Sequence, residues 1–334
     1  MDKILKEITH QETFTSEQAK EIIIDITKEE YSNEQIAAIL MGIQMRGVTV
    51  DEIIGFREGL LATGKAVDLS PYNVIDIVGT GGDGKNTFNI STAACLVVAG
   101  AGYKVAKHGN YAASSVSGAS NVLEAHGIKF TSDNDQLRRN IETCGFVYQH
   151  APLFASGMKY VAPARKQMGV LGTPTFFNLL GPLVNPCRPT HQLLGVADLN
   201  QMRLYQQVYQ RLNIQFGIVT SIDGYDEISL TSDFKVITNT KEHIYTADKV
   251  GMKAFKQNEL YGGNTLDEAK KIFDNVLTNQ CTEAQKDVVL INAAFAIQVI
   301  EPDKSIDECI SIAKESLESG KAYNVLTKYI ELNS

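Results

Sequence analysis

The sequence contains no tryptophan and only five cysteines among its 334 residues. The cysteines are odd in number and widely scattered, and no two of them form a C-x-x-C pair. This pattern argues against a disulfide framework and against a cysteine-bound zinc site, and it is typical of reduced thiols. Because the first residues also lack the apolar core of a signal peptide, we expect a cytoplasmic protein.

Basic residues are outnumbered: 31 Lys and Arg stand against 39 Asp and Glu, which gives a formal net charge of −8. Nucleic acids and anionic membranes attract basic surfaces, so the sequence predicts neither partner. The longest apolar stretch, residues 93–102, has about half the length that a bilayer-spanning helix requires. If the protein binds an anionic ligand, local groups must hold it against the overall charge.

The chain is long enough for two domains, and its first 70 residues are predicted to be helical. Capping-box patterns open three helices there, and apolar residues at helical spacing follow each of them. Gly47 stands where a glycine would end the second of these helices. The boxes are Thr15-x-x-Gln18, Ser32-x-x-Gln35 and Thr49-x-x-Glu52.

Beyond Ser70-Pro71 the pattern becomes that of an α/β protein. A β-branched run at residues 74–78 ends in glycines, an alanine-rich helix is predicted over 89–101, and a second strand over 103–106. Strand, loop, helix and strand in this order form a βαβ unit. Later in the chain, strands are predicted at 193–196 and 216–220, a helix over 199–212, and helices near 265–278, 282–300, 305–319 and 321–332.

We therefore predict a small all-helical N-terminal domain and a larger α/β domain with a mainly parallel central sheet. The helical domain would comprise residues 1–70 and a return segment near 160–188, because residues 169–189 are rich in Gly and Pro. The α/β domain would comprise residues 71–159 and 189–334.

A glycine-rich loop, residues 79–87, leaves the first predicted strand and leads into a helix. Clustered glycines let backbone N–H groups approach an anion, and the helix N-terminus adds a positive dipole end. The loop fits the dinucleotide pattern G-x-G-x-x-G, but no acidic residue occurs between Asp83 and Glu124 to hold a ribose hydroxyl. A P-loop is also unlikely, since Asn86 replaces the magnesium-binding hydroxyl and Asp83 would repel a triphosphate.

Polar groups gather around this loop at the predicted strand ends. Residues 89–92 would open the helix, residues 107–110 follow the second strand, and a serine cluster at 114–118 adds hydroxyls and backbone donors. Each of these taken alone has a structural explanation, but together they describe a pocket for a sugar with several phosphates. Asp226 and Glu227, alone typical of an acidic surface turn, become natural Mg²⁺ ligands beside such a pocket.

Taken together, these motifs closely resemble the anthranilate phosphoribosyltransferase family. The matching stretches are DIVGTGGDGKNTFNIST at 76–92, VAKHGN at 105–110, VAPARKQMG at 161–169, FNLLGPLVNP at 177–186 and the pair Asp226-Glu227. The resemblance covers essentially the whole chain. It implies a fold related to the pyrimidine nucleoside phosphorylases, a homodimer joined through the helical domain, and Mg²⁺ as cofactor.

The resemblance also assigns binding residues for two small-molecule substrates. 5-Phosphoribosyl 1-diphosphate would be bound by Gly79, Gly82, Asp83, Thr87, Asn89, Ile90, Ser91, Thr92, Lys107, His108, Gly109, Asn110, Ser114 and Ser115. Anthranilate would be held by Gly79, Asn110 and Arg165, and magnesium by Ser91, Asp226 and Glu227. Arg165 suits the anthranilate carboxylate because a guanidinium matches a carboxylate in a bidentate way.

The reaction implied is displacement of diphosphate at the ribose anomeric carbon by the aromatic amine. No residue is identified as a covalent nucleophile or general base, so positioning and electrostatics would provide the catalysis. Two alternatives stay open: a pyrimidine nucleoside phosphorylase of the same fold, and a non-catalytic paralogue that acts as a binding protein. The chain also departs from the family, with Ala155-Ser156 in place of a His-Pro pair and with Tyr111 where Arg is frequent.

Overall fold

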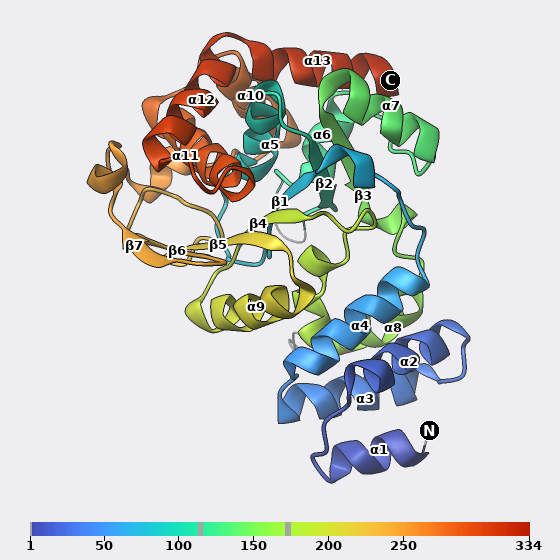
Figure 1. Ribbon diagram of the computed structural model, residues 1–334. Helices are drawn as coiled ribbons and strands as arrows, with labels where there is room; N and C mark the ends of the chain where they lie inside the picture. Colours follow the sequence, from blue (N-terminus) through green and yellow to red (C-terminus); the bar gives the residue numbers. More distant parts are fainter. Residues whose placement is uncertain (1, 113–115, 171–174) are drawn as a thin grey trace. The chain divides into compact units, whose positions relative to one another are not determined.

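The computed structural model describes residues 2–112, 116–170 and 175–334. The chain divides into two compact units (Figure 1). Met1–Val67 and Ala151–Arg188 form the smaller, helical unit, and Asp68–His150 and Pro189–Ser334 form the larger one. A helical unit and a larger α/β unit with a mostly parallel sheet make up the fold class that the sequence predicts.

The helical unit begins its main helices at the predicted capping boxes. Thr15, Ser32 and Thr49 each accept a hydrogen bond from the backbone three residues later, and the residue there bonds back to the cap. Gly47, at φ +88°, ends α3, which is the second of the three helices that the capping boxes predict. The helices are α1 (Asp2–Thr9), α2 (Ser16–Thr27), α3 (Asn33–Arg46), α4 (Val50–Ala62) and α8 (Met158–Val170), with short 3-10 turns η2 (Ala151–Leu153), η3 (Phe176–Leu179) and η4 (Gly181–Leu183).

The return segment begins at Ala151, earlier than the position near residue 160 that the sequence suggested. Phe154 is buried, and its carbonyl accepts a hydrogen bond from the Lys65 backbone. Ser156 donates to the carbonyl of Thr63. These contacts lie far apart in sequence, so the local pattern of residues 151–159 gave no sign of them.

The larger unit is built on a seven-stranded sheet in the order β3-β2-β1-β4-β5-β6-β7. The pairs from β3 to β5 are parallel, and β6 and β7 extend the sheet antiparallel. The strands are β1 (Ile75–Gly79), β2 (Val105–Gly109), β3 (Phe146–His150), β4 (His191–Gly195), β5 (Gln215–Ser221), β6 (Phe234–Thr238) and β7 (Glu242–Tyr245). The sequence missed β3, β6 and β7, because short runs of mixed residues carry little period-2 signal.

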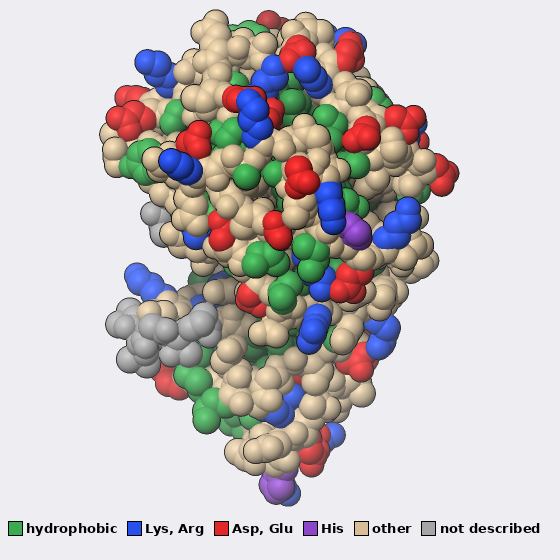
Figure 2. Space-filling view, turned by 90° about the vertical axis from the view of Figure 1, so that its left-hand side faces the viewer, with side chains coloured by type: hydrophobic (Ala, Val, Ile, Leu, Met, Phe, Trp, Pro, Cys, Tyr) green, Lys and Arg blue, Asp and Glu red, His purple; other side chains and the backbone are tan. Residues whose placement is uncertain are grey.

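The core of the larger unit lies between the sheet and a group of helices, with α5 and α11 the most deeply buried (Figure 1). The remaining helices and turns are α5 (Ile90–Gly100), α6 (Ala119–Ala125), α7 (Asn134–Cys144), α9 (Leu199–Leu212), α10 (Leu266–Leu277), α11 (Glu283–Ile300), α12 (Ile306–Glu318), α13 (Lys321–Asn333), η1 (Ser70–Tyr72), η5 (Ala247–Val250) and η6 (Gln257–Leu260). Among the helices that the structure describes, none is long and apolar enough to cross a membrane. Over the larger unit, Figure 2 shows acidic and basic side chains interspersed.

Candidate active site

The candidate site lies at the carboxyl ends of the parallel strands. The chain passes from β1 through α5 to β2 on one side, and it later places β4 on the other side of β1. Such a reversal of strand order leaves a crevice at the strand ends, where ligands of α/β proteins bind. Gly79 and Gly195 are register partners at the last position of β1 and β4.

These two glycines make room for the loop that carries Asp226. A Cβ on Gly79 would lie 2.4 Å from Asp226 Oδ2, and a Cβ on Gly195 would lie 1.6 Å from the Asp226 carbonyl oxygen. Neither distance is possible for a real side chain. The two glycines therefore let Asp226 rest directly on the strand ends.

The glycine-rich loop after β1 packs on the loop that carries Asp226 and Glu227, which we call the acidic loop. Gly81 N–H donates to Asp226 Oδ2 at 2.6 Å. The Lys85 ammonium lies 4.6 Å from the ring centroid of Tyr225, and Lys85 N–H donates to Asp83. Gly81 and its neighbour Gly82 have φ +68° and +76°, which glycine adopts without strain. The loop thus needs glycine for its backbone angles, whereas the strand ends need it for space.

Three carboxylates are crowded together here. Burial, together with the charge of Asp83, raises the pKa of Asp226 to about 7. Burial and the charges of Asp226 and Asp83 raise the pKa of Glu227 well above its usual value, while Lys107 and the Ser91 backbone oppose that shift. Carboxylates held so close to one another at neutral pH need a cation or protons to share the charge.

The donor set fits a magnesium ion. Glu227 Oε2 is enclosed and has no hydrogen-bond partner among the described residues, so a lone pair is left for a ligand. Residues 2–112, 116–170 and 175–334 hold no group of three or more His, Cys, Asp or Glu side chains arranged as a metal site. Mg²⁺ is commonly held by one or two carboxylates, with water and substrate phosphates completing its shell, so this poor protein donor set suits it.

The start of α5 faces the same region. Asn89 is the N-cap, and its side chain accepts a hydrogen bond from the backbone of Thr92. The Ser91 hydroxyl accepts a hydrogen bond from the Lys107 ammonium at 3.3 Å. The Ile90 side chain is fully buried in the core, so only its backbone is left for a ligand. Thr92 Oγ1 is enclosed and has no partner within the described part of the chain.

Lys107, on β2, is buried, and its ammonium donates to the carbonyl of Ile77 at 2.6 Å. It donates to Ser91, and its positive charge stabilises the carboxylate of Glu227. Lys107 therefore lies next to the acidic cluster, which consists of Asp83, Asp226 and Glu227. His108 is also buried, and its backbone N–H donates to Asp76. A direct contact of Lys107 or His108 with phosphate stays a prediction.

Asn110 follows β2 and is exposed. Its Oδ1 accepts a hydrogen bond from the Tyr111 backbone at 2.8 Å. The side-chain NH₂ is therefore left to donate outward, which suits a carboxylate ligand. Thr87, at the end of the glycine-rich loop, is tied to the segment before α6: its carbonyl accepts a hydrogen bond from the Ser117 hydroxyl at 2.6 Å. Ser114 and Ser115 lie outside the described residues.

Arg165 belongs to the helical unit, on α8. Asn178 Oδ1 accepts from its guanidinium at 2.7 Å, and the Phe177 ring centroid lies 5.8 Å from Cζ. Burial lowers the pKa of Arg165 from its usual high value. The sequence motif around Phe177 and Asn178 therefore orients this arginine, which the sequence alone did not reveal.

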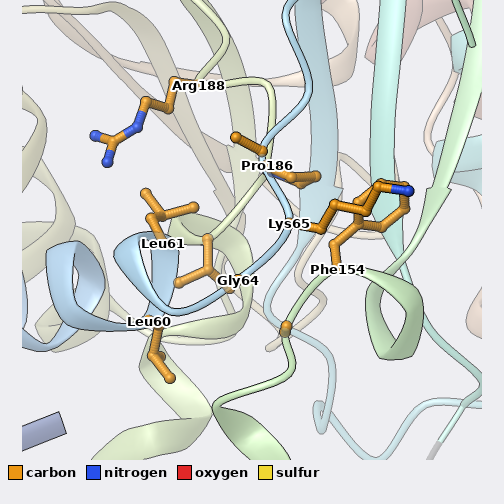
Figure 3. A pocket seen from close by; sticks show the side chains of 10 residues that line it. Leu60, Leu61, Gly64, Lys65, Phe154, Pro186 and Arg188 are labelled. Carbon is orange, nitrogen blue, oxygen red and sulfur yellow. The ribbon is translucent and has the colours of Figure 1, made fainter. Parts of the chain in front are cut away.

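The helical unit also holds a small cavity of about 90 Å³ (Figure 3). Its lining comes from the end of α4, from the start of the return segment and from residues 184–188. Ala155 lines this cavity, and the hydroxyl of Ser156 beside it donates to the carbonyl of Thr63.

Sequence reasoning missed two features of the acidic cluster. Gly195 was assigned only to a strand, although it is as necessary as Gly79 for the approach of Asp226. Asp83 was assigned to the substrate, whereas in the structure its charge also raises the pKa of Asp226. The sequence signal was Asp83 itself, because an acidic residue inside a glycine-rich anion loop favours a cation nearby.

Comparisons with known proteins first place the chain in a class. Residues 71–323 match the α/β domain of a glycosyl transferase family, and residues 2–64 match the helical bundle domain of that family. Fold and site thus define a glycosyl transferase with a helical bundle and an α/β domain.

Individual relatives are more specific. The anthranilate phosphoribosyltransferases of Phocaeicola vulgatus and Bacteroides thetaiotaomicron are 60% and 55% identical over 334 residues, covering 100% of both chains. The crystal structure of anthranilate phosphoribosyltransferase from Thermus thermophilus is similar, with a TM-score of 0.92 and 31% identity, over 98% of each chain. The Saccharomyces cerevisiae enzyme in complex with PRPP and Mg has a TM-score of 0.90 and 26% identity, over 99% of this chain and 96% of that one. The chain belongs to the anthranilate phosphoribosyltransferase family.

Proposed function

We infer that the chain transfers the phosphoribosyl group of 5-phosphoribosyl 1-diphosphate to the amine of anthranilate. The products are N-(5-phosphoribosyl)anthranilate and diphosphate, in tryptophan biosynthesis. The observation that carries this inference is the acidic cluster seated on Gly79 and Gly195, beside the glycine-rich loop, in a chain 60% identical to a full-length relative of this activity.

We propose that the glycine-rich loop and the start of α5 bind the diphosphate and ribose. The N–H groups of Thr80 and Gly81 already bond to Gly195 and Asp226, so the loop would donate to the ligand from Gly82. Asn89, Ser91 and Thr92 lie at the N-terminal end of the helix. The same proposal covers Asp83, Thr87, Ile90, Lys107, His108, Gly109, Ser114 and Ser115. Helix N-termini and clustered amides stabilise phosphate oxygens without a net positive charge on the protein. In this proposal, an acidic protein binds a polyanion through local backbone donors.

Mg²⁺ would be held by Asp226, Glu227 and Ser91, together with phosphate oxygens and water. When bound, it would withdraw charge from the leaving diphosphate and share the charge of the crowded carboxylates. Use of Mg²⁺ is supported by the related yeast enzyme, which is described in complex with PRPP and Mg. The charge of Lys107 partly opposes the rise in the pKa of Glu227 and so favours its carboxylate form.

Anthranilate would be held by Arg165, Asn110 and the backbone at Gly79. The Arg165 guanidinium is oriented by Asn178 and the Phe177 ring, and Asn110 presents its NH₂ group. The aromatic amine is neutral near pH 7 and attacks the anomeric carbon directly, so no general base is required. Alignment of the two reactants provides much of the rate enhancement.

We also propose that the protein is a homodimer joined through its helical unit. A groove of about 260 Å³ between α1 and α2 is lined by apolar Ile4, Phe14 and Ile22 and by the polar or charged side chains of Lys3, Glu7, Glu17, Gln18, Glu21 and Asp25. Met45, on α3, is 83% exposed. Apolar surface of this kind on one unit is typical of an interface. Size-exclusion chromatography with light scattering tests this, and a monomer at micromolar concentration would contradict it. A cytoplasmic location stays a prediction from the sequence.

The function is tested by following anthranilate fluorescence in the presence of 5-phosphoribosyl 1-diphosphate and Mg²⁺. We expect the signal to fall only when all three components are present. No loss of signal with anthranilate or with other aromatic amines would contradict the transferase. Phosphorolysis of a pyrimidine nucleoside would instead support the phosphorylase, and inactivity in both assays the non-catalytic paralogue.

A further inference from the structure

Asn110 and its two chain neighbours, Gly109 and Tyr111, all contact one group of buried residues. On its N-terminal side, a Cβ on Gly109 would lie 2.8 Å from the Tyr148 hydroxyl, so that the strand end packs tightly on this ring. At Asn110 itself, the carbonyl accepts a hydrogen bond from the Ser120 backbone at 3.3 Å. On its C-terminal side, the Tyr111 ring meets the His150 ring edge to face, with centroids 5.1 Å apart.

The Ser120 hydroxyl joins the parts of this group. Ser120 lies in the first turn of α6 and is fully buried. Its Oγ is 2.6 Å from the Tyr148 hydroxyl and 2.9 Å from His150 Nδ1. A single hydroxyl thus links the side chain below Gly109 to the side chain beside Tyr111. Buried networks in which every member is bonded hold one geometry firmly.

The outer members of the group are anchored in the rest of the larger unit. Phe130 stacks on His150 at 4.6 Å between centroids. The backbone N–H of Tyr148 donates to the hydroxyl of Tyr329, on α13, at 3.1 Å. Tyr111 donates from its hydroxyl to Glu124 at 3.2 Å. Through these contacts, the segment that carries Asn110 is packed against β3 and the C-terminal helix α13.

We propose that Ser120 and His150 are positioning residues that fix the Asn110 amide for anthranilate. Neither residue is in the set expected to touch substrate. The Tyr111 N–H holds Oδ1 of Asn110 and so sets the direction in which its NH₂ donates, and the Tyr111 ring packs on His150. Without the Ser120 hydroxyl, His150 and Tyr148 each lose a hydrogen bond, and the side chain of Asn110 is held less firmly in one orientation. This inference rests on the proposed function.

Two variants test it by different means. Ser120→Ala removes the shared hydroxyl, and His150→Phe keeps an aromatic ring against Tyr111 and Phe130 but removes Nδ1. We expect each to raise the anthranilate KM about tenfold, the loss that a missing hydrogen bond of ordinary strength produces, with a smaller change in the KM for the phosphoribosyl donor. Because both variants break the same bond, the double variant should be less impaired than the product of the two effects.

The matched control is Ser316→Ala. Ser316, on α12, is also fully buried and donates from its hydroxyl to a backbone carbonyl, that of Val97, at 2.7 Å. Its loss should lower stability and leave both KM values unchanged. A KM shift in this control as large as in Ser120→Ala would overturn the positioning role. If Ser120→Ala does not fold, the His150→Phe result decides.

The Asn110→Ala variant provides the reference pattern. Ser120→Ala should change the two KM values and kcat in the same proportions as Asn110→Ala does, to a smaller degree. An unchanged anthranilate KM in both Ser120→Ala and His150→Phe, with an active wild type, would overturn the inference alone. An inactive wild type would overturn the proposed function instead, so the two failures are distinguishable.

Discussion

The main-chain carbonyl of Asp226 occupies the space in which a side chain on Gly195 would begin, 1.6 Å from the position of its Cβ. A backbone carbonyl cannot move out of the way as easily as the end of a flexible side chain can. Gly195→Ala is therefore expected to push the acidic loop off the strand ends. Since a shift of about 1 Å in a catalytic group lowers rates about 100-fold, we expect kcat/KM to fall by at least about that factor.

The control for this substitution is Gly169→Ala. Gly169 lies in α8, has nothing within 4 Å of its Cβ position, and is exposed. Alanine is favoured over glycine there by helix propensity, so stability should rise slightly. Full activity of the Gly195→Ala enzyme at ordinary Mg²⁺ would show that the acidic loop does not depend on this close approach.

The acidic cluster should make the metal-free protein less stable at alkaline pH. The pKa of Asp226 is about 7 in the fold, against about 4 in an unfolded chain, so between these values the folded state binds more protons. Above pH 7 the carboxylate is ionised in both states, and in the fold it lies among the charges of Asp83 and Glu227. We expect the Tm in the presence of a chelator to be higher at pH 6 than at pH 8.

Asp226→Asn should raise the metal-free Tm at pH 8 by a few degrees and reduce this pH dependence. The same variant should lose most activity, because it removes a proposed magnesium ligand. Mg²⁺ should raise the Tm of the wild type and not that of Asp226→Asn. A variant whose Tm at pH 8 stays below that of the wild type in chelator would contradict this account of the cluster.

Arg165→Ala is expected to raise the anthranilate KM about 10- to 100-fold, the loss associated with a charged hydrogen-bonded pair. Asn178→Ala should give a smaller change in the same direction, because Asn178 only orients the guanidinium. Lys166→Ala, an exposed neighbour on the same helix, is the control. Equal shifts for both substrates in Arg165→Ala would reassign this residue to the phosphoribosyl donor.

The hydrogen-bonded carboxylate of Asp274 should make the larger unit sensitive to acid. His126 Nε2 lies 2.8 Å from Asp274 Oδ1, and burial alone would raise the pKa of Asp274, but the bonds from His126 and Lys270 bring it below its usual value. A depressed pKa stabilises the fold above about pH 4, and this contribution is lost as pH falls through the folded value. Asp274→Asn should lower stability at pH 7 by about 1 kcal/mol and leave it unchanged near pH 2, measured by urea unfolding.

The strongest local signals determined much of the fold. Thr15, Ser32 and Thr49 are followed by the residues that complete their capping boxes, so each helix start could be read from four neighbouring positions. The strand–loop–helix order around the glycines identified the anion loop in the same way. Strand β3, in contrast, is defined by its pairing with β2, and its sequence shows no regular alternation.

By itself, the sequence determined the helix starts, the βαβ order and the types of side chain at the strand ends, since all of these depend on residues within a few positions of one another. Only the tertiary structure decided which groups meet. Gly195 and Asp226 are separated by a strand, a helix and a turn, and Ser120 meets His150 thirty residues away. Close approach across such separations depends on packing, so no local pattern encodes it, and it is there that the acidic cluster and the support of Asn110 arise.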